Sequence, residues 1–188
     1  MPDSKVTITP TFSKIEDTKP LKNGFDDVAS SAWYADAVQY ITDKGLMNGI
    51  GDNKFSPSAS TTRGMLMTVL ARYAGEDTTG GATWYEKAMN WAKQTGVSDG
   101  TMPEVNITRE QLATMLYSYA KLRGIDTTQG GMAVREFQDF DQISAYAADA
   151  MTWAVNAGIL KGDQNRLLPQ SPCTRGQIVT LLHRLLEG

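Results

Sequence analysis

The chain has 188 residues, of which 41% are hydrophobic and 21% are charged, and its formal net charge is −3. This composition is typical of a globular protein, and it contains no basic run of the kind that favours nucleic acid. No apolar stretch reaches the roughly 18 residues that a membrane-spanning helix needs. The single cysteine, Cys173, cannot form a disulfide within the chain. We therefore expect no nucleic-acid partner and no membrane span.

Residues 1–23 show no helical periodicity, and we interpret them as a tail or linker from a preceding region. Residues 6–9 could form a short extended stretch. The N-terminus lacks the apolar segment of a signal peptide. We expect any cargo region fused to this module to lie N-terminal to it.

Three segments after this tail align without gaps, and each has the period of an amphipathic helix. They start at Trp33, Trp84 and Tyr146. The aligned columns hold an opening aromatic residue, an alanine (Ala37, Ala88, Ala150), a second aromatic residue (Tyr40, Trp91, Trp153) and a closing glycine (Gly45, Gly96, Gly158). Glycine takes the left-handed conformation without strain, so each closing glycine predicts a helix C-terminus.

Each of these segments is followed by a loop and a second predicted helix that starts with a Thr-Arg pair. The pairs are Thr62-Arg63, Thr108-Arg109 and Thr174-Arg175, and an apolar stripe begins three residues after each arginine. The threonine is a favourable N-cap. Gln111 and Gln177 would complete a capping box in the second and third copies, whereas Met65 would leave the first with half of one.

The repetition predicts an all-α fold made of three tandem helix-loop-helix repeats. We place the copies at residues 24–76, 80–125 and 134–188. A two-helix unit cannot bury its apolar face alone, but three in series can share one core. We expect one structural domain, a monomer in which the three copies close into a pseudo-threefold bundle with a shared helical core.

The arginine at each helix start needs an explanation, because a helix N-terminus carries a partial positive charge. A cation there costs about 0.3–1 kcal/mol when exposed. Three arginines at matching positions suggest a bound anion, held by free backbone N–H groups and by the guanidinium. The alternative is a structural ion pair with an acidic residue of a neighbouring loop, such as Asp52 or Asp163.

The opening aromatic residues, Trp33, Trp84 and Tyr146, also allow two interpretations. Aromatic residues at helical spacing usually belong to the core, but these three could form stacking platforms for sugar rings. The second set, which lies in mid-helix, is better explained as core.

The motifs resemble the S-layer homology (SLH) family over about residues 24–188. The first copy carries Phe25-Asp26-Asp27-Val28, then Trp33-Tyr34-Ala35-Asp36-Ala37, then the loop from Gly49 through Gly51 and Asp52 to Phe55-Ser56-Pro57, then Thr62-Arg63. The third copy opens with Phe137-Gln138-Asp139-Phe140, and the second copy has no such opening. Several motifs in the same order, in triplicate, make the resemblance specific.

The resemblance implies a secreted module that attaches a protein non-covalently to the bacterial cell wall. Its implied partner is a secondary cell-wall polysaccharide that carries ketal-linked pyruvate, bound in grooves between neighbouring repeats. By position, the resemblance implies that Arg63, Arg109 and Arg175 bind the ligand. We add as candidate ligand-binding residues Trp33, Trp84, Tyr146, Gly51, Asp52 and Asp163. No enzyme activity, metal or cofactor is implied.

Departures from the family pattern predict that the three grooves differ. The alanine of the family's T-R-A-E motif is Gly64, Glu110 or Gly176 here. Glu110 places a negative charge next to Arg109, and the loop of the second copy is short. We therefore predict that the grooves of Arg63 and Arg175 bind the polysaccharide and that the Arg109 groove is degenerate.

Two other classes of protein fit the sequence less well. A helical-repeat scaffold for protein–protein interaction explains paired helices, but repeats of the tetratricopeptide type are about 34 residues long. Here Trp33 and Trp84 are 51 residues apart. A glycoside hydrolase needs two carboxylates in a distinctive setting, and no such pair recurs. The single histidine, His183, lies beside the apolar stripe of the last helix and is better explained as packed or surface-exposed than as catalytic.

Overall fold

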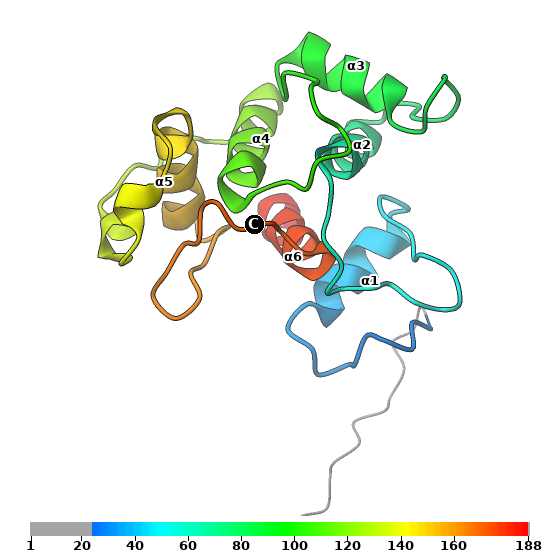
Figure 1. The fold of residues 1–188 in the computed structure, drawn as a ribbon, viewed down its shortest axis with the longest axis horizontal. Coiled ribbons are helices and arrows are strands. Elements are labelled where there is room, and N and C mark those ends of the chain that lie inside the picture. The colour runs from blue at the N-terminus through cyan, green and yellow to red at the C-terminus, as the bar shows by residue number, and fades with distance from the viewer. Residues whose placement is uncertain (1–23, 188) are drawn as a thin grey trace, which may run out of the picture.

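The structure is a computed structural model that describes residues 24–187 (Figure 1). Its six α-helices are α1 (Ala35–Asp43), α2 (Arg63–Tyr73), α3 (Glu86–Thr95), α4 (Arg109–Leu122), α5 (Ala148–Asn156) and α6 (Arg175–Glu187). Three short 3₁₀ helices precede α5: η1 (Ala133–Glu136), η2 (Phe140–Gln142) and η3 (Ala145–Ala147). This part of the chain has isolated β-bridges but no strand. The predicted all-α class is confirmed.

The structure does not test two of the predictions made from the sequence. The interpretations of residues 1–23, including the extended stretch at 6–9, lie outside the described residues. The copy boundaries 24–76, 80–125 and 134–188 stay a prediction, although each range contains two of the six α-helices.

The helix ends follow the sequence signals closely. The hydroxyl of Thr62 accepts from the backbone N–H of Met65, and Thr108 forms a full capping box with Gln111. Thr174 and Gln177 exchange the same two hydrogen bonds, at 3.0 and 3.3 Å. The closing glycines of the first helices all have positive φ angles: Gly45 at 65°, Gly96 at 74° and Gly158 at 70°. Local sequence therefore determines where these helices start and stop.

The main helix pairs do not form within a copy. Helix α2 packs against α3, α4 against α5, and α6 against α1, so the second helix of each copy packs on the first helix of the next one. In Figure 1 the second helices α2, α4 and α6 lie toward the middle of the molecule, and α1, α3 and α5 lie around them. The third copy thereby closes onto the first.

A closed ring of backbone hydrogen bonds joins the segments that lead into the three second helices. Thr61 N donates to Cys173 O at 3.0 Å, Cys173 N to Ile107 O at 2.9 Å, and Ile107 N to Thr61 O at 2.9 Å. Cys173 is free and buried, and burial raises its thiol pKa to about 12, so the thiol is protonated and unreactive at neutral pH. The ring fixes the relative position of all three helix starts.

Two of the three loops are held by an aspartate of the opening motif. Asp27 accepts from the backbone N–H groups of Phe55 and Ser56, at 2.8 and 2.7 Å. Asp139 accepts in the same way from Leu167 (2.7 Å) and Leu168 (2.8 Å). The second copy lacks the opening motif, and its shorter loop has no equivalent contact among the described residues.

The core is continuous through the three copies, and it includes Ile41, Leu70, Leu116, Met151 and Leu182, all essentially inaccessible to solvent. Trp153 belongs to this core, while Tyr40 and Trp91 are half-buried against it. His183 packs against Tyr40, with ring centroids 4.8 Å apart. Within residues 24–187, no helix is long and apolar enough to cross a membrane.

Candidate functional site

The backbone at the three helix starts is not free to bind an anion, which corrects the expectation from the sequence. The first two N–H groups of each second helix donate to carbonyl groups of the next copy's loop. The acceptors are Val105 and Pro103 for Arg63 and Gly64, Ser171 and Pro169 for Arg109 and Glu110, and Ala59 and Pro57 for Arg175 and Gly176. The third N–H group is capped by threonine. Closure of the ring brings these carbonyls to the helix ends, which sequence spacing could not reveal.

The three arginine side chains are buried, with 8%, 7% and 6% of Arg63, Arg109 and Arg175 exposed. Each one reaches across to the next copy. Arg175 donates from Nε to Phe55 O and from Nη2 to Asn48 O, at 2.8 and 2.7 Å. Arg109 donates to Leu167 O and Lys161 O, at 2.6 and 3.0 Å. These arginines therefore connect neighbouring copies, and their remaining nitrogen, Nη1, makes no hydrogen bond within the described residues.

Arg63 differs from the other two because it forms an ion pair. Its Nη2 lies 2.5 Å from Asp99 Oδ1, and its Nε donates to Thr101 O at 3.0 Å. Neither acidic residue proposed from the sequence, Asp52 or Asp163, is ion-paired with an arginine in the described structure. Arg109 and Arg175 have no carboxylate within ion-pair distance there, and the hydrogen bonds of their guanidinium groups go to backbone carbonyls. Arg175 also lies over the ring of Phe55, 4.5 Å from its centroid.

A hollow lies beside each of these arginines, and all three copies contribute to every hollow. The Arg175 hollow, of about 180 Å³, is lined by the loop after α1, by α2, by Arg175 of the third copy and by Trp84 of the second. The Arg63 hollow (about 250 Å³) has the same arrangement around the loop and second helix of the second copy, with Tyr146 as its aromatic residue. The Arg109 hollow (about 370 Å³) has it around those of the third copy, with Trp33 as its aromatic residue. The sites therefore exist only in the closed ring.

A second arginine distinguishes two of the hollows, and the sequence interpretation missed it. Arg72 lines the Arg175 hollow and Arg184 lines the Arg109 hollow, each nine residues after the Thr-Arg arginine of its own copy. Arg72 donates to Leu46 O and Arg184 to Ile159 O, at 3.3 and 3.0 Å. Ser118 takes the equivalent place in the Arg63 hollow. Aligning the second helices would have shown this difference.

The charges of the three hollows follow from these residues. The Arg175 hollow is lined by two arginines and no acidic residue. The Arg109 hollow has two arginines, Lys161 and Asp163. The Arg63 hollow has one arginine and Asp99, and so has no net charge. Burial lowers the pKa of Arg175, an effect partly offset by the negative charge of Asp27, but an arginine stays protonated at any physiological pH.

The opening aromatic residues are not core residues. Each ends up just before its first helix, and 64% of Trp33, 53% of Trp84 and 59% of Tyr146 is exposed. Trp33 packs edge-on against Tyr34, and Trp84 against Tyr85, with centroids 5.1 Å apart in both pairs. The interpretation of these three residues as core is therefore wrong, and each leaves a ring at the rim of a hollow.

Glu110 does not face Arg109. Its carboxylate accepts from Ser144 N (3.0 Å), Ser144 Oγ (2.8 Å) and the hydroxyl of Tyr146 (2.8 Å). Burial by itself would raise the pKa of Glu110, but these hydrogen bonds hold it below its usual value. Burial and the bond to Glu110 raise the pKa of Tyr146. The charge of Glu110 is therefore used to fix Tyr146 beside the Arg63 hollow.

Gly51 and Asp52 belong to a tight turn and do not line the three hollows. Gly51 pairs with Lys54 in an isolated bridge, and Asp52 and Asn53 at the tip have φ angles of 48° and 52°. Asp163 occupies the position of Gly51 within its turn but also lines the Arg109 hollow. Of these three predicted residues, the structure brings only Asp163 into a hollow.

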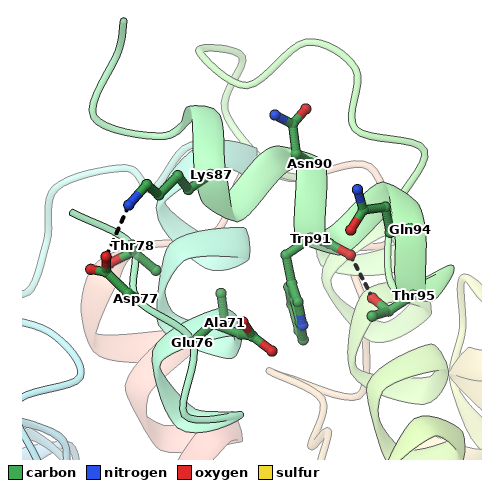
Figure 2. Close-up of a pocket in the computed structure, with 9 residues that line it drawn as sticks. All are labelled: Ala71, Glu76, Asp77, Thr78, Lys87, Asn90, Trp91, Gln94 and Thr95. Atoms are coloured by element: carbon green, nitrogen blue, oxygen red, sulfur yellow. Dashed lines mark hydrogen bonds and ion pairs between the residues drawn. The ribbon is translucent and has the colours of Figure 1, made fainter. Parts of the chain in front are cut away.

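A further hollow of about 430 Å³ lies between the C-terminal end of α2 and α3, and it has a different character (Figure 2). Figure 2 shows Lys87 pointing toward Asp77, with which it forms an ion pair of 2.9 Å. Trp91 extends from α3 beside Glu76 and Ala71. This hollow is lined by no arginine, and we assign it no role.

The fold is a closed ring of helix pairs with composite, arginine-lined hollows between them. The S-layer homology domain family matches residues 24–64 and 136–179, which are the first copy through the start of α2 and most of the third. These two segments match the S-layer homology domain and confirm the resemblance seen in the motifs of the first and third copies. The second copy, which lacks the opening motif, lies outside both matches.

The chain is also similar to several much longer proteins. It is 25% identical over 179 residues to exoglucanase XynX of Acetivibrio thermocellus, covering 87% of this chain and 16% of that protein. It is 24% identical over 183 residues to the surface-layer 125 kDa protein of Lysinibacillus sphaericus, covering 88% of this chain and 15% of that protein. The chain thus spans less than a fifth of these relatives.

Among solved structures, the undecaheme cytochrome from the S-layer of Carboxydothermus ferrireducens is similar at 18% identity and a TM-score of 0.47. The match covers 80% of this chain and 20% of that one. The family match and the surface-layer relatives together support a cell-wall anchoring module located at the cell surface or in the cell wall.

Proposed function

We propose that this chain is a secreted, non-catalytic module that anchors a bacterial protein to the cell wall by binding an anionic secondary cell-wall polysaccharide. The Arg175 and Arg109 hollows are its acid-binding sites. The supporting observation is that each combines two arginines with an exposed tryptophan, and that the Nη1 atoms of Arg175 and Arg109 are left without a partner in the described structure.

The physical reason lies in the uncompensated charge of these two arginines. A buried cation without a counter-ion is unfavourable, and carbonyl dipoles compensate it only in part. A carboxylate that enters the hollow would accept charge-assisted hydrogen bonds from the free guanidinium nitrogens. A pyruvate ketal on a sugar presents such a carboxylate next to a ring that could stack on Trp84 or Trp33.

This proposal changes the ranking of the grooves that we predicted from the sequence. The Arg109 hollow keeps a net positive charge, since Glu110 faces Tyr146 instead and Asp163 is outnumbered by two arginines and Lys161. The Arg63 hollow is the neutralised one, because Asp99 pairs with its arginine. We therefore propose the Arg175 and Arg109 hollows as the acid-binding pair and keep all three copies as one binding unit.

The test is co-sedimentation of the protein with cell-wall sacculi, before and after mild-acid removal of pyruvate. We expect binding to the untreated wall and a large loss after treatment. The variants Arg72→Gln and Arg184→Gln should weaken binding, whereas Arg123→Gln, which removes the same charge from an exposed position at the end of α4, should not.

The possible failures separate the alternatives. Binding that is indifferent to pyruvate would leave the anchoring role intact and exclude the acid-binding mechanism. No binding to any wall preparation would favour the helical scaffold for protein–protein interaction.

A further inference from the structure

The Arg63 hollow has the same frame as the other two but a different chemistry. Asp99 takes the place that Asn48 has in the Arg175 hollow and Lys161 in the Arg109 hollow. The other hollows use a backbone carbonyl at this position, but here the carboxylate itself binds the arginine. A ligand carboxylate placed beside Arg63 would meet a negative charge that already satisfies the guanidinium, so this hollow is unfavourable for an acidic group.

Most of the other side chains that line the Arg63 hollow are polar and uncharged, and Val97 and Met115 are apolar. Ser118 stands in the place of the second arginine, and Thr114 and Gln111 lie along the same face of α4. Asp99 Oδ1 accepts from Arg63, from Thr101 N and from the hydroxyl of Ser98. Hydroxyls, an amide and a carboxylate are donors and acceptors that suit an uncharged, hydroxyl-rich ligand.

The aromatic residue of this hollow is held in a way that the two tryptophans are not. Tyr146 donates its hydroxyl to Glu110, which is 2% exposed and also accepts twice from Ser144. The ring stays 59% exposed while its polar end is fixed. A rigid, exposed ring with its hydroxyl occupied offers a face for stacking and loses little entropy on binding.

We infer that the Arg63 hollow is a subsite for an uncharged saccharide unit of the wall polysaccharide, complementary to two acid-binding hollows. This inference rests on the proposed function and assigns different chemistry to its third site. The module then selects a glycan that contains both kinds of unit, because two of its hollows bind acidic saccharide units and the third binds a neutral one.

The first test uses reporters that separate the hollows in the unmodified protein. Trp84, Trp33 and Tyr146 each line a different hollow, so NMR spectra with labelled tryptophan and tyrosine rings report on all three at once. The probes are wall-polysaccharide fragments before and after mild-acid removal of pyruvate. We expect untreated fragments to shift all three rings, and treated fragments still to shift Tyr146 while the two tryptophan signals lose their response.

The second test exchanges the distinguishing residues. The double variant Asp99→Asn, Ser118→Arg gives the Arg63 hollow the pattern of the Arg175 hollow, and calorimetry should show the number of acidic-fragment sites rising from two to three. The reciprocal variant Asn48→Asp, Arg72→Ser should lower it from two to one. Circular dichroism and urea unfolding check that both variants fold, and the reporter test stands if either does not.

The outcomes distinguish this inference from the proposed function. If removal of pyruvate abolishes the Tyr146 shift as it does the tryptophan shifts, or if treated fragments leave Tyr146 unchanged, the neutral subsite is wrong while the anchoring proposal stands. If no fragment shifts any of the three rings and the protein does not bind sacculi, the proposed function itself fails.

Discussion

The Arg109 hollow and the Arg63 hollow are built on the same backbone frame and differ in charge. In both, a buried arginine at a helix start reaches the loop of the next copy through Nε and Nη2. One is then surrounded by Lys161 and Arg184 and the other by Asp99 and Ser118. The motif arginine therefore has two roles. It connects neighbouring copies in all three hollows, whereas the residues around it set the charge that each hollow offers to a ligand.

The loops beside these hollows differ as well. The long loop beside the Arg109 hollow is held by the carboxylate of Asp139, which is 1% exposed and accepts two backbone hydrogen bonds. The short loop beside the Arg63 hollow has Asp99, whose side chain is 62% exposed. An acidic residue therefore has a structural role in one loop and an electrostatic one in the other.

The largest effect should come from the buried aspartate. Asp139→Asn replaces an acceptor with an amide N–H₂ that faces a backbone donor, so a buried N–H loses its partner. We expect a loss of about 2–4 kcal/mol in the free energy of unfolding, measured with urea. Asp99→Asn, at an exposed position where the amide oxygen can still accept from Arg63, should cost no more than about 1 kcal/mol. Equal losses in the two variants would contradict the difference between the loops.

The next largest effect concerns binding to sacculi. Arg109→Gln should weaken it roughly tenfold or more, because charge-assisted hydrogen bonds to the polysaccharide are lost. Arg63→Gln should stay within about threefold, because its charge is already neutralised by Asp99. Binding isotherms test this, with urea unfolding as the control, since both variants lose contacts between copies. A weaker effect of Arg109→Gln than of Arg63→Gln would restore the ranking predicted from the sequence.

A smaller effect should come from the contact that fixes Tyr146. Tyr85 approaches Gly64 and Tyr34 approaches Gly176. The residues at the corresponding positions of the third pair are Ala147 and Glu110. Glu110→Gly alone should cost about 1–3 kcal/mol of stability, since its hydrogen-bond donors lose their acceptor. Adding Ala147→Tyr should recover part of this loss, giving a coupling of about 1 kcal/mol in a double-mutant cycle. Strict additivity would show that the two positions are independent.

The smallest predicted effect is on pH dependence. Burial alone would raise the pKa of Asp139, but the N–H groups of Leu167 and Leu168 hold it below its usual value. Because the folded pKa is lowered, the unfolded state binds more protons in this range and stability falls with acidification. This contribution is complete above the unfolded value of about 3.9 and disappears as the pH falls through the folded value. Asp139→Asn should therefore show a shallower loss of stability in urea titrations between about pH 5 and 2.

Much of the fold could be predicted from local patterns. The Thr-Arg starts, the capping boxes of Thr108 and Thr174 and the closing glycines each depend on residues a few positions apart, and all of them appear as predicted. The interpretation of the opening aromatic residues as core was wrong, because periodicity alone cannot distinguish a residue in the first turn of a helix from one just before it. Trp33 and Trp84 lie just outside, where their rings reach a neighbouring copy's hollow.

The composite sites could be predicted only in part. The three motif arginines were found from their repetition, and a second repetition nine residues later, Arg72 and Arg184, was there to be found. The neutralisation of Arg63 by Asp99 had no local signal, because it joins residues 36 positions apart in different copies. The same holds for Glu110, whose neighbour in sequence is Arg109 but whose carboxylate binds Tyr146 from the next copy.

By itself, the sequence determined the helices and their ends, because these depend on short-range hydrogen bonding and on the period of apolar side chains. Only the tertiary structure decided that each second helix packs on the next copy, that carbonyls of the neighbouring loop satisfy the helix N-termini, and which carboxylate faces which arginine. Closing three copies into a ring brings together residues that are far apart along the chain. The charge of each hollow is therefore set by contacts between copies.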